Sequence, residues 1–282
     1  MGNKEIKIGL HKDIPEKEYF QINQGLSKSS LSMFLKSPYK YWYMNYGQGL
    51  EEQPEKESFR VGSMVHCAIL EPERFAKDYR VGEFKDKRSK AWKEFSANCY
   101  KDGVIGITTT DKEMVDGMRQ SIKALPMAYT LLCRGGEAEV TAISHDEKTG
   151  IQLRSRFDFL PDGGQQNIIV DLKTCRSAMP QGFAYSCRDY DYDLQVAFYM
   201  LNARLCGLPV SEFIFIAIEK TPPYEARAYA ISEKDLKHAF NRLRKGIDKF
   251  HAYKEEFGTS PDKPWPSNKE HIQILNLNRK DD

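Results

Sequence analysis

The sequence predicts an α/β protein in which helices cover both faces of a central mixed β-sheet. Three observations support this fold class. Several short apolar or alternating runs after residue 136 have the length of strands, and Gly-containing turns separate them. A segment of crossover size lies between two of these strands and has helical spacing. Further amphipathic stretches provide helices on each side of the sheet.

The N-terminal half of the chain is predicted to be mainly helical. Hydroxyl residues open the stretch 26–47, where Pro38 divides two short helices, the second of them rich in aromatic residues. Residues 59–70 are almost all apolar, which indicates a buried helix that ends at Glu71. Another helix is expected over 111–133.

The strands of the sheet are expected in the second half of the chain, at 137–144, 151–160, 166–173, 212–220 and 225–232. The segments DEKTG and PDGG are hairpin turns that join the first three strands. Leu194, Phe198, Leu201 and Leu205 form a helical stripe between the third and fourth strands. A crossover of this kind makes those two strands parallel.

Ser232 and Asp235 predict the cap of an amphipathic helix that follows the last strand. We expect a single domain over 1–257, followed by a polar tail. Its parts are an N-terminal helical part at 26–58, a core at about 59–232, a C-terminal helix at 232–257 and the tail at 258–282.

The composition is that of a globular protein with a sizeable core. No apolar run approaches the roughly 20 residues that span a membrane, and the first residues lack a secretory pattern, so we expect a cytoplasmic protein. The six cysteines form no C-x-x-C pair, which argues against zinc and iron–sulfur sites and favours reduced thiols. Because the net charge is +2, a nucleic-acid site must be a local patch.

Charged residues end two of the apolar strands. Asp158 lies near the end of the second strand, and Asp171 and Lys173 end the third on one face. A hairpin would bring these side chains together, and the two carboxylates would repel each other unless a cation lay between them. Mg²⁺ prefers such oxygen ligands, and a lysine beside it would have a lowered pKa and could position or deprotonate water. This combination suits phosphodiester hydrolysis.

The order of these motifs resembles the PD-(D/E)xK nuclease superfamily, and most closely its RecE-type branch of exodeoxyribonuclease VIII and phage relatives. The resemblance covers roughly residues 26–232. The motifs that carry it are LSKSSLSMFLKSPYKYW, VGSMVHCAILEPERF, RSKAWKEF, LRSRFDFL, VDLKT and YDLQVAFYM. It implies a restriction-endonuclease-like core: a mixed sheet flanked by helices.

The resemblance also implies roles for individual residues. His66, Asp158 and Asp171 would bind Mg²⁺, for which Mn²⁺ would substitute, and Lys173 would activate water. Gln195 and Tyr199 would orient water or substrate. Taken alone, His66 would be a core histidine and Asp171–Lys173 a strand-end ion pair.

Four further residues are possible DNA contacts, each with ordinary solvation as the alternative: Arg154, Arg156, Lys90 and Trp92. Glu137 begins the first strand near the same edge, and Glu71 ends the buried helix. Whether either glutamate contributes to the metal site is left open.

The resemblance implies a Mg²⁺-dependent exonuclease that degrades linear double-stranded DNA from its ends. It would leave single strands for a partner such as a single-strand annealing recombinase. The alternatives are an endonuclease on the same core, of the restriction or junction-resolving kind, and a non-catalytic DNA-binding module. A cyclic homo-oligomer is expected. The aromatic segment Tyr39, Tyr41, Trp42, Tyr43 and Tyr46 is nominated as its subunit contact, with packing in the chain's own core as the alternative.

Overall fold

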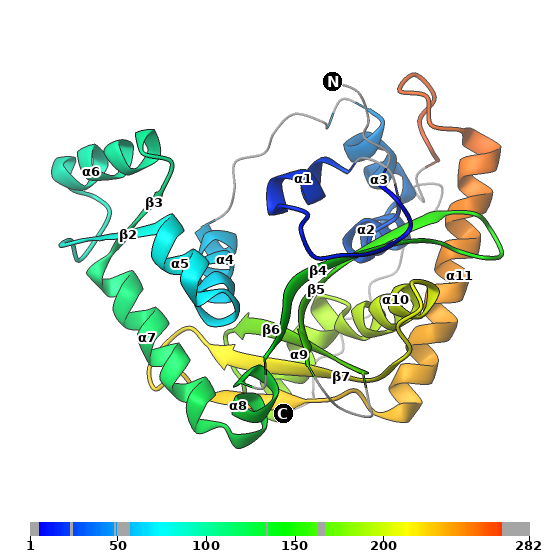
Figure 1. Ribbon diagram of the computed structural model, residues 1–282. Helices are drawn as coiled ribbons and strands as arrows, with labels where there is room; N and C mark the ends of the chain where they lie inside the picture. Colours follow the sequence, from blue (N-terminus) through cyan, green and yellow to red (C-terminus); the bar gives the residue numbers. More distant parts are fainter. Residues whose placement is uncertain are drawn as a thin grey trace, which may run out of the picture.

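The computed structural model describes residues 6–22, 25–47, 49, 57–133, 135–162 and 167–266. In this part of the chain, six strands form a central sheet in the order β1-β4-β5-β6-β7-β8 (Figure 1). They are β1 (Gly9–His11), β4 (Gly136–His145), β5 (Gln152–Pro161), β6 (Asn167–Cys175), β7 (Val210–Glu219) and β8 (Ala226–Tyr229). All neighbouring strands are antiparallel except β6 and β7, which are parallel. The predicted mixed sheet is therefore confirmed.

Eleven helices are found among the described residues. They are α1 (Glu16–Gln21), α2 (Lys28–Lys36), α3 (Pro38–Asn45), α4 (Glu57–Leu70), α5 (Pro72–Asp78), α6 (Lys90–Lys101), α7 (Thr109–Ala124), α8 (Pro126–Cys133), α9 (Pro180–Asp189), α10 (Tyr192–Leu205) and α11 (Glu233–Phe257). The break at Pro38 is confirmed: Ser37 ends α2 and caps α3 by accepting the N–H of Lys40. Ser232 caps α11 as predicted.

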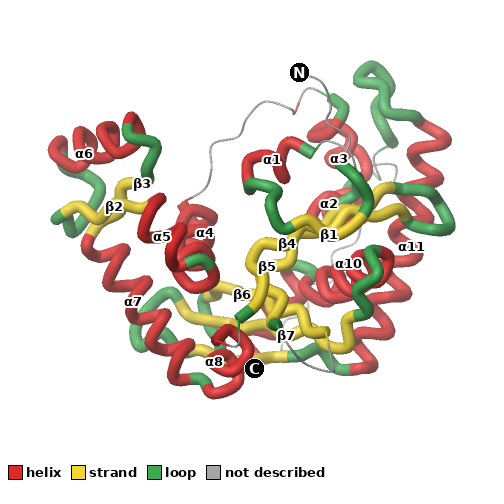
Figure 2. Tube along the Cα trace, in the orientation of Figure 1, coloured by secondary structure: helices red, strands yellow, loops and turns green. Residues whose placement is uncertain are grey.

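The two faces of the sheet carry different helices. The apolar residues of α4, α7 and α8 form one core cluster with β6 and β7, and those of α9 and α10 form another on the opposite face. Helix α11 packs on α10 together with α2, and forms a third cluster. Because α9 and α10 connect β6 to β7, the predicted crossover is confirmed. Figure 2 shows β4 and β5 extending from the centre of this sheet towards α2 and α11.

Two differences from the sequence prediction lie between residues 79 and 133. The helix expected over 111–133 ends at Ala124, because Pro126 disfavours helical geometry at Leu125, and resumes as α8. Strands β2 (Tyr79–Gly82) and β3 (Ile105–Thr108) form a small parallel sheet joined by α6. The sequence analysis predicted neither these strands nor α6.

The described part of the expected polar tail is attached to the rest of the protein through Trp265. Trp265 is 1% exposed, stacks on Tyr41 with ring centroids 5.4 Å apart, and packs edge-on against Phe34 and Phe250. Its indole donates to the Gly258 carbonyl at 2.8 Å. Trp265 therefore belongs to the core beside α11 and anchors residues 258–266, which are otherwise mostly exposed, whereas residues 267–282 lie outside the described part.

The same cluster corrects the nominated subunit contact. Tyr41 and Trp42 are 5% and 7% exposed and pack inside their own chain, so neither can be the centre of an interface. Tyr39 and Tyr43 are more open at 38% and 40%. The alternative, that this segment serves the core, is correct for its two most buried rings.

Candidate active site

Asp158 is placed where strands β5 and β6 diverge. The register of these strands has a single pair among the described residues, Phe159 with Val170, and the next positions along the two strands are Asp158 and Asp171. Beyond them the N–H of Leu172 donates to Asp158 Oδ2 at 2.8 Å. A buried backbone N–H needs a partner, and here a side-chain carboxylate takes the place of a strand carbonyl.

His66 of α4 lies beside this carboxylate, with its Nδ1 3.4 Å from Asp158 Oδ2. Burial, and next the charge of Lys173, lower the pKa of His66. The imidazole is therefore neutral near pH 7, which is the form that can bind a metal. Its expected position next to Asp158 is what the structure shows.

Asp171 is fully buried at 0% exposure. The Gln195 amide of α10 donates to its Oδ2 at 2.5 Å, and the Lys173 ammonium forms an ion pair with its Oδ1. Among the described residues, no donor makes a properly directed hydrogen bond to Oδ1. One carboxylate oxygen thus has a neutral donor, whereas the other depends on a positive charge alone.

The protonation of the pair differs from the expectation. Burial by itself would lower the pKa of Lys173, but the carboxylates of Asp171 and Asp158 outweigh it and raise that pKa. The expectation of a lowered pKa assumed a neighbouring cation. In the protein alone, Lys173 is a protonated ion-pair partner.

The pKa of Asp158 is raised as well, which for an acid favours the neutral form. Burial, and next the charge of Asp171, raise its pKa to about 8. Ionising two carboxyl groups that lie close together inside a protein costs electrostatic free energy unless a cation lies near them. The aspartates therefore interact strongly, as their predicted convergence requires.

The family to which the chain belongs follows from a comparison over most of its length. Residues 27–275 match the family described as "PDDEXK-like domain of unknown function (DUF3799)". The chain belongs to this family. This PDDEXK-like membership supports the PD-(D/E)xK nuclease superfamily that the motifs resemble. A search of curated proteins found no match.

One solved structure supports the fold. The crystal structure of "Putative exonuclease" from Eubacterium rectale is 16% identical, with a TM-score of 0.58 over 84% of this chain and 85% of that one. Protein SSO0001 (16% identity; 72% and 81% covered) and protein VC1899 from Vibrio cholerae (10%; 87% and 62%) have TM-scores of 0.30 and 0.20. Those two values are too low to bear on the fold.

Glu139 is an acidic residue of this PDDEXK-like site that the sequence analysis missed. It lies in β4 with a φ of 56°, and the β4–β5 ladder is interrupted there between Ala138–Phe159 and Val140–Phe157. Counting the register back from the 146–150 turn places Glu139 opposite Asp158, so the hairpin itself held the signal. Burial, and next the charge of Asp158, raise the pKa of Glu139.

The two glutamates that were considered lie elsewhere. Glu137 pairs with Lys12 at 2.6 Å near the surface. Glu71 pairs with Arg74 at 2.6 Å at the start of α5. Glu139 also has a cationic partner, Arg156, but it is the glutamate that the β4–β5 register places opposite Asp158.

Arg154 and Arg156 are half-buried, and neither is a freely solvated surface arginine. Arg156 donates to Glu139 at 2.5 Å and to the Ile14 carbonyl at 2.8 Å. Arg154 donates to the Tyr19 carbonyl at 2.9 Å, and both guanidinium groups lie on the Tyr19 ring at 5.3 and 5.5 Å.

The basic run 85–93 is not brought to this site. Trp92 is 5% exposed because it packs on Phe84 and Phe95, so its ring is not available for DNA. Lys90 is exposed at the start of α6, 3.8 Å from Glu94. The expectation for Trp92 is therefore wrong.

Helix α10 brings three functional candidates to the strand ends. Gln195 reaches Asp171 as described, and Tyr199 packs against Phe157 with centroids 5.4 Å apart. Burial raises the pKa of Tyr199 well above its ordinary value, so the phenol stays protonated. Tyr192, which the sequence analysis did not single out, lies 5.1 Å from the Lys173 ammonium.

The donor set fits a hard divalent cation in kind. It offers carboxylates from three strands and a neutral imidazole, and Asp171 Oδ1 is a buried oxygen that only a positive charge balances. Among the described residues, no three histidine, cysteine or acidic side chains already stand grouped around one point. Binding would thus need the side chains to turn from one another towards the ion.

No helix in the described part of the chain is both long and apolar enough to cross a bilayer.

Proposed function

We propose that this PDDEXK-like protein is a Mg²⁺-dependent exonuclease that hydrolyses linear double-stranded DNA from its ends. One observation carries the proposal: buried Asp171 is held between Lys173 and Gln195 next to Asp158. This is the D…D-x-K arrangement with its glutamine, assembled by the strands and helix that the motifs predict. A purely structural ion pair would not need a second carboxylic acid at the same point.

His66, Asp158 and Asp171 would hold the metal, and Glu139 is placed to join them. Mn²⁺ should substitute, because it accepts the same ligands. When bound, the ion offsets charge that develops on the phosphate and makes a bound water more acidic.

The protein's own groups then divide the remaining work. Lys173 is protonated and enters as a hydrogen-bond donor, which orients the attacking water and a phosphate oxygen. Gln195 holds Asp171 in place. The oxygen of water forms the new bond to phosphorus and gives up one proton, the ester P–O bond breaks, and the departing oxygen takes up one proton.

The name of the E. rectale structure, "Putative exonuclease", supports an exonuclease, and the RecE-type resemblance supports DNA as its substrate. End-labelled linear duplex and covalently closed circular DNA, each with Mg²⁺ and with EDTA, test this. Loss of label from the linear duplex, with the circle intact, is expected. Cleavage of the circle would mean an endonuclease. Absence of metal-dependent cleavage of either substrate would mean a binding module.

The proposal includes a closed ring of identical subunits and a single-strand annealing recombinase as the partner that receives the product. A ring would retain DNA by topology, which suits a protein whose net charge is only +2. Light scattering at micromolar protein tests this assembly. A monomer would contradict the ring but would not bear on the proposed hydrolysis of DNA.

A further inference from the structure

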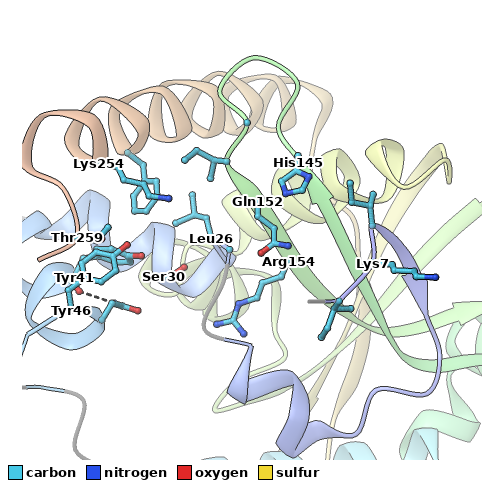
Figure 3. Close-up of a pocket in the computed structure, with 17 residues that line it drawn as sticks. Lys7, Leu26, Ser30, Tyr41, Tyr46, His145, Gln152, Arg154, Lys254 and Thr259 are labelled. Carbon is cyan, nitrogen blue, oxygen red and sulfur yellow. Dashed lines mark hydrogen bonds between the residues drawn. The ribbon is translucent and has the colours of Figure 1, made fainter. Parts of the chain in front are cut away.

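A separate groove lies at the far end of the β4–β5 hairpin from the candidate active site (Figure 3). Its volume is about 990 Å³. The walls come from the N-terminal segment 6–8, from α2 and α3, from the β4–β5 hairpin and from the C-terminal end of α11.

The charge of this groove is one-sided. Among its described lining residues, Lys7, Arg154 and Lys254 are cationic and none is acidic. Figure 3 shows Lys254, His145 and Arg154 around its centre, with Lys7 at one edge. Arg154 has a buried Nε without a hydrogen-bond partner in the described residues. In a protein with 40 acidic residues, a groove of this size without one favours an anionic ligand.

Apolar and aromatic side chains lie between these cations. Ile8 is 58% exposed, and Ile6 and Tyr46 are half-buried, so these lining side chains lie where a ligand can reach them. In a duplex the base faces are stacked on one another, so a protein meets mainly phosphates and base edges. In a single strand the base faces are free to contact rings and apolar groups. The mixed lining therefore fits a single strand better than a duplex.

The groove and the candidate active site both involve strand β5. Arg154, Arg156 and Asp158 alternate along β5, and the two arginines share the Tyr19 ring while Arg156 also binds Glu139 beside Asp158. From Arg154 to Asp158 is about 13 Å at the rise of a strand.

We propose that this groove binds single-stranded DNA, its phosphates on Lys254 and Arg154 and its bases on the apolar lining. The inference rests on the proposed function, because it makes the groove the holding site for one strand of the DNA that the active site processes. It adds a site that neither the D-x-K motif nor the metal ligands include.

Binding of a fluorescent single-stranded oligonucleotide, in EDTA so that nothing is cleaved, tests the groove. Lys254→Glu and the double variant Lys7→Glu/Lys254→Glu change exposed lysines. We expect the double variant to bind at least about tenfold more weakly at 50 mM salt, with a salt dependence shallower by about 0.7 for each lysine lost. Lys101→Glu makes the same charge change on α6, on the opposite side of the molecule (Figure 1), and should bind like the wild type.

A second measurement uses the unaltered protein, so it does not depend on the variants folding. Acetylation of Lys254 should be slowed by the single strand, whereas acetylation of Lys101 should not. Unchanged binding by the double variant, equal weakening by Lys101→Glu, or preference of the groove for duplex would each overturn the proposal. Failure of the proposed function would be detected in a different assay, as the absence of metal-dependent cleavage by the wild type.

Discussion

Gln195 donates its amide to the Asp171 carboxylate across 2.5 Å and so joins helix α10 to strand β6 at the centre of the site. Asp171 is fully buried, so no water can replace this donor. The bond fixes which way the carboxylate faces.

Replacing Gln195 by alanine should lower both activity and stability. The unpaired oxygen of Asp171 costs about 1–3 kcal/mol in the free energy of unfolding. Loss of a residue that orients a metal ligand typically costs about 10–100-fold in metal affinity or activity. Denaturant unfolding and cleavage of labelled duplex measure the two effects. Gln181→Ala, at an exposed position of α9, is the control. Wild-type values for both quantities would show that α10 does not position Asp171.

Lys173→Ala should bind DNA almost normally and lose most turnover. Its donor orients the nucleophile, a role worth roughly 10²–10⁴-fold in rate. Single-turnover cleavage and a gel shift in EDTA separate the two properties. Lys237→Ala removes an exposed lysine of α11 and should match the wild type in both. Near-normal cleavage by the Lys173 variant would reduce this residue to an ion-pair partner of Asp171.

Mg²⁺ binding should release a proton at pH 7. Burial and the charge of Asp171 raise the pKa of Asp158 to about 8, so the acid is mostly protonated there and must ionise to bind metal. Affinity should rise by up to tenfold per pH unit below 8 and level off above it. Calorimetry in buffers of different ionisation enthalpy detects the proton, and Asp158→Asn should abolish its release. Metal binding without proton exchange in the wild type would contradict the raised pKa.

The same raised pKa should make the metal-free protein less stable as the pH rises from about 4 to 8. In this window the unfolded chain releases the Asp158 proton while the folded protein keeps it, so folding is progressively disfavoured. As the pH rises from about 4 to 8, Asp158→Asn should become progressively more stable relative to the wild type, as measured by the free energy of unfolding. A constant difference would mean that Asp158 titrates normally.

Glu139 and Glu137 form a matched pair of positions in β4. Glu139→Gln should weaken Mg²⁺-dependent cleavage by about 10–100-fold, because its carboxylate faces Asp158 and is placed to join the metal. Glu137→Gln removes a surface ion pair with Lys12, which is worth at most about 1 kcal/mol, and should leave cleavage unchanged. The reverse order of effects would restore Glu137 as the outer ligand.

The sequence predicted the strands, the crossover and the meeting of Asp158 with Asp171, because each depends on local patterns and short connections, whereas a role for Gln195 came from the family resemblance. Apolar runs set the strands, the DEKTG turn sets one hairpin, and the helical stripe of α10 sets the crossover. The metal and the roles assigned to these residues stay predictions.

Other features could not be found in this way, because they depend on contacts between distant segments. The left-handed backbone of Glu139 is not visible in any periodic pattern, although the hairpin register by itself places this residue opposite Asp158. Trp92 has basic neighbours in sequence, but Phe84 and Phe95 bury its ring. The pairing of β2 with β3 spans the whole of α6, and neither strand is long enough to be recognised alone.

The burial of Trp265 decides where the polypeptide can be shortened. A chain cut at Phe257, the end of α11, would look complete by its helices but would lose the indole that covers Phe34, Tyr41 and Phe250. These rings would then form an exposed hydrophobic surface, and such surfaces promote aggregation. A cut after Pro266 keeps the indole in place. Recombinant production should therefore give more soluble protein from the second boundary than from the first.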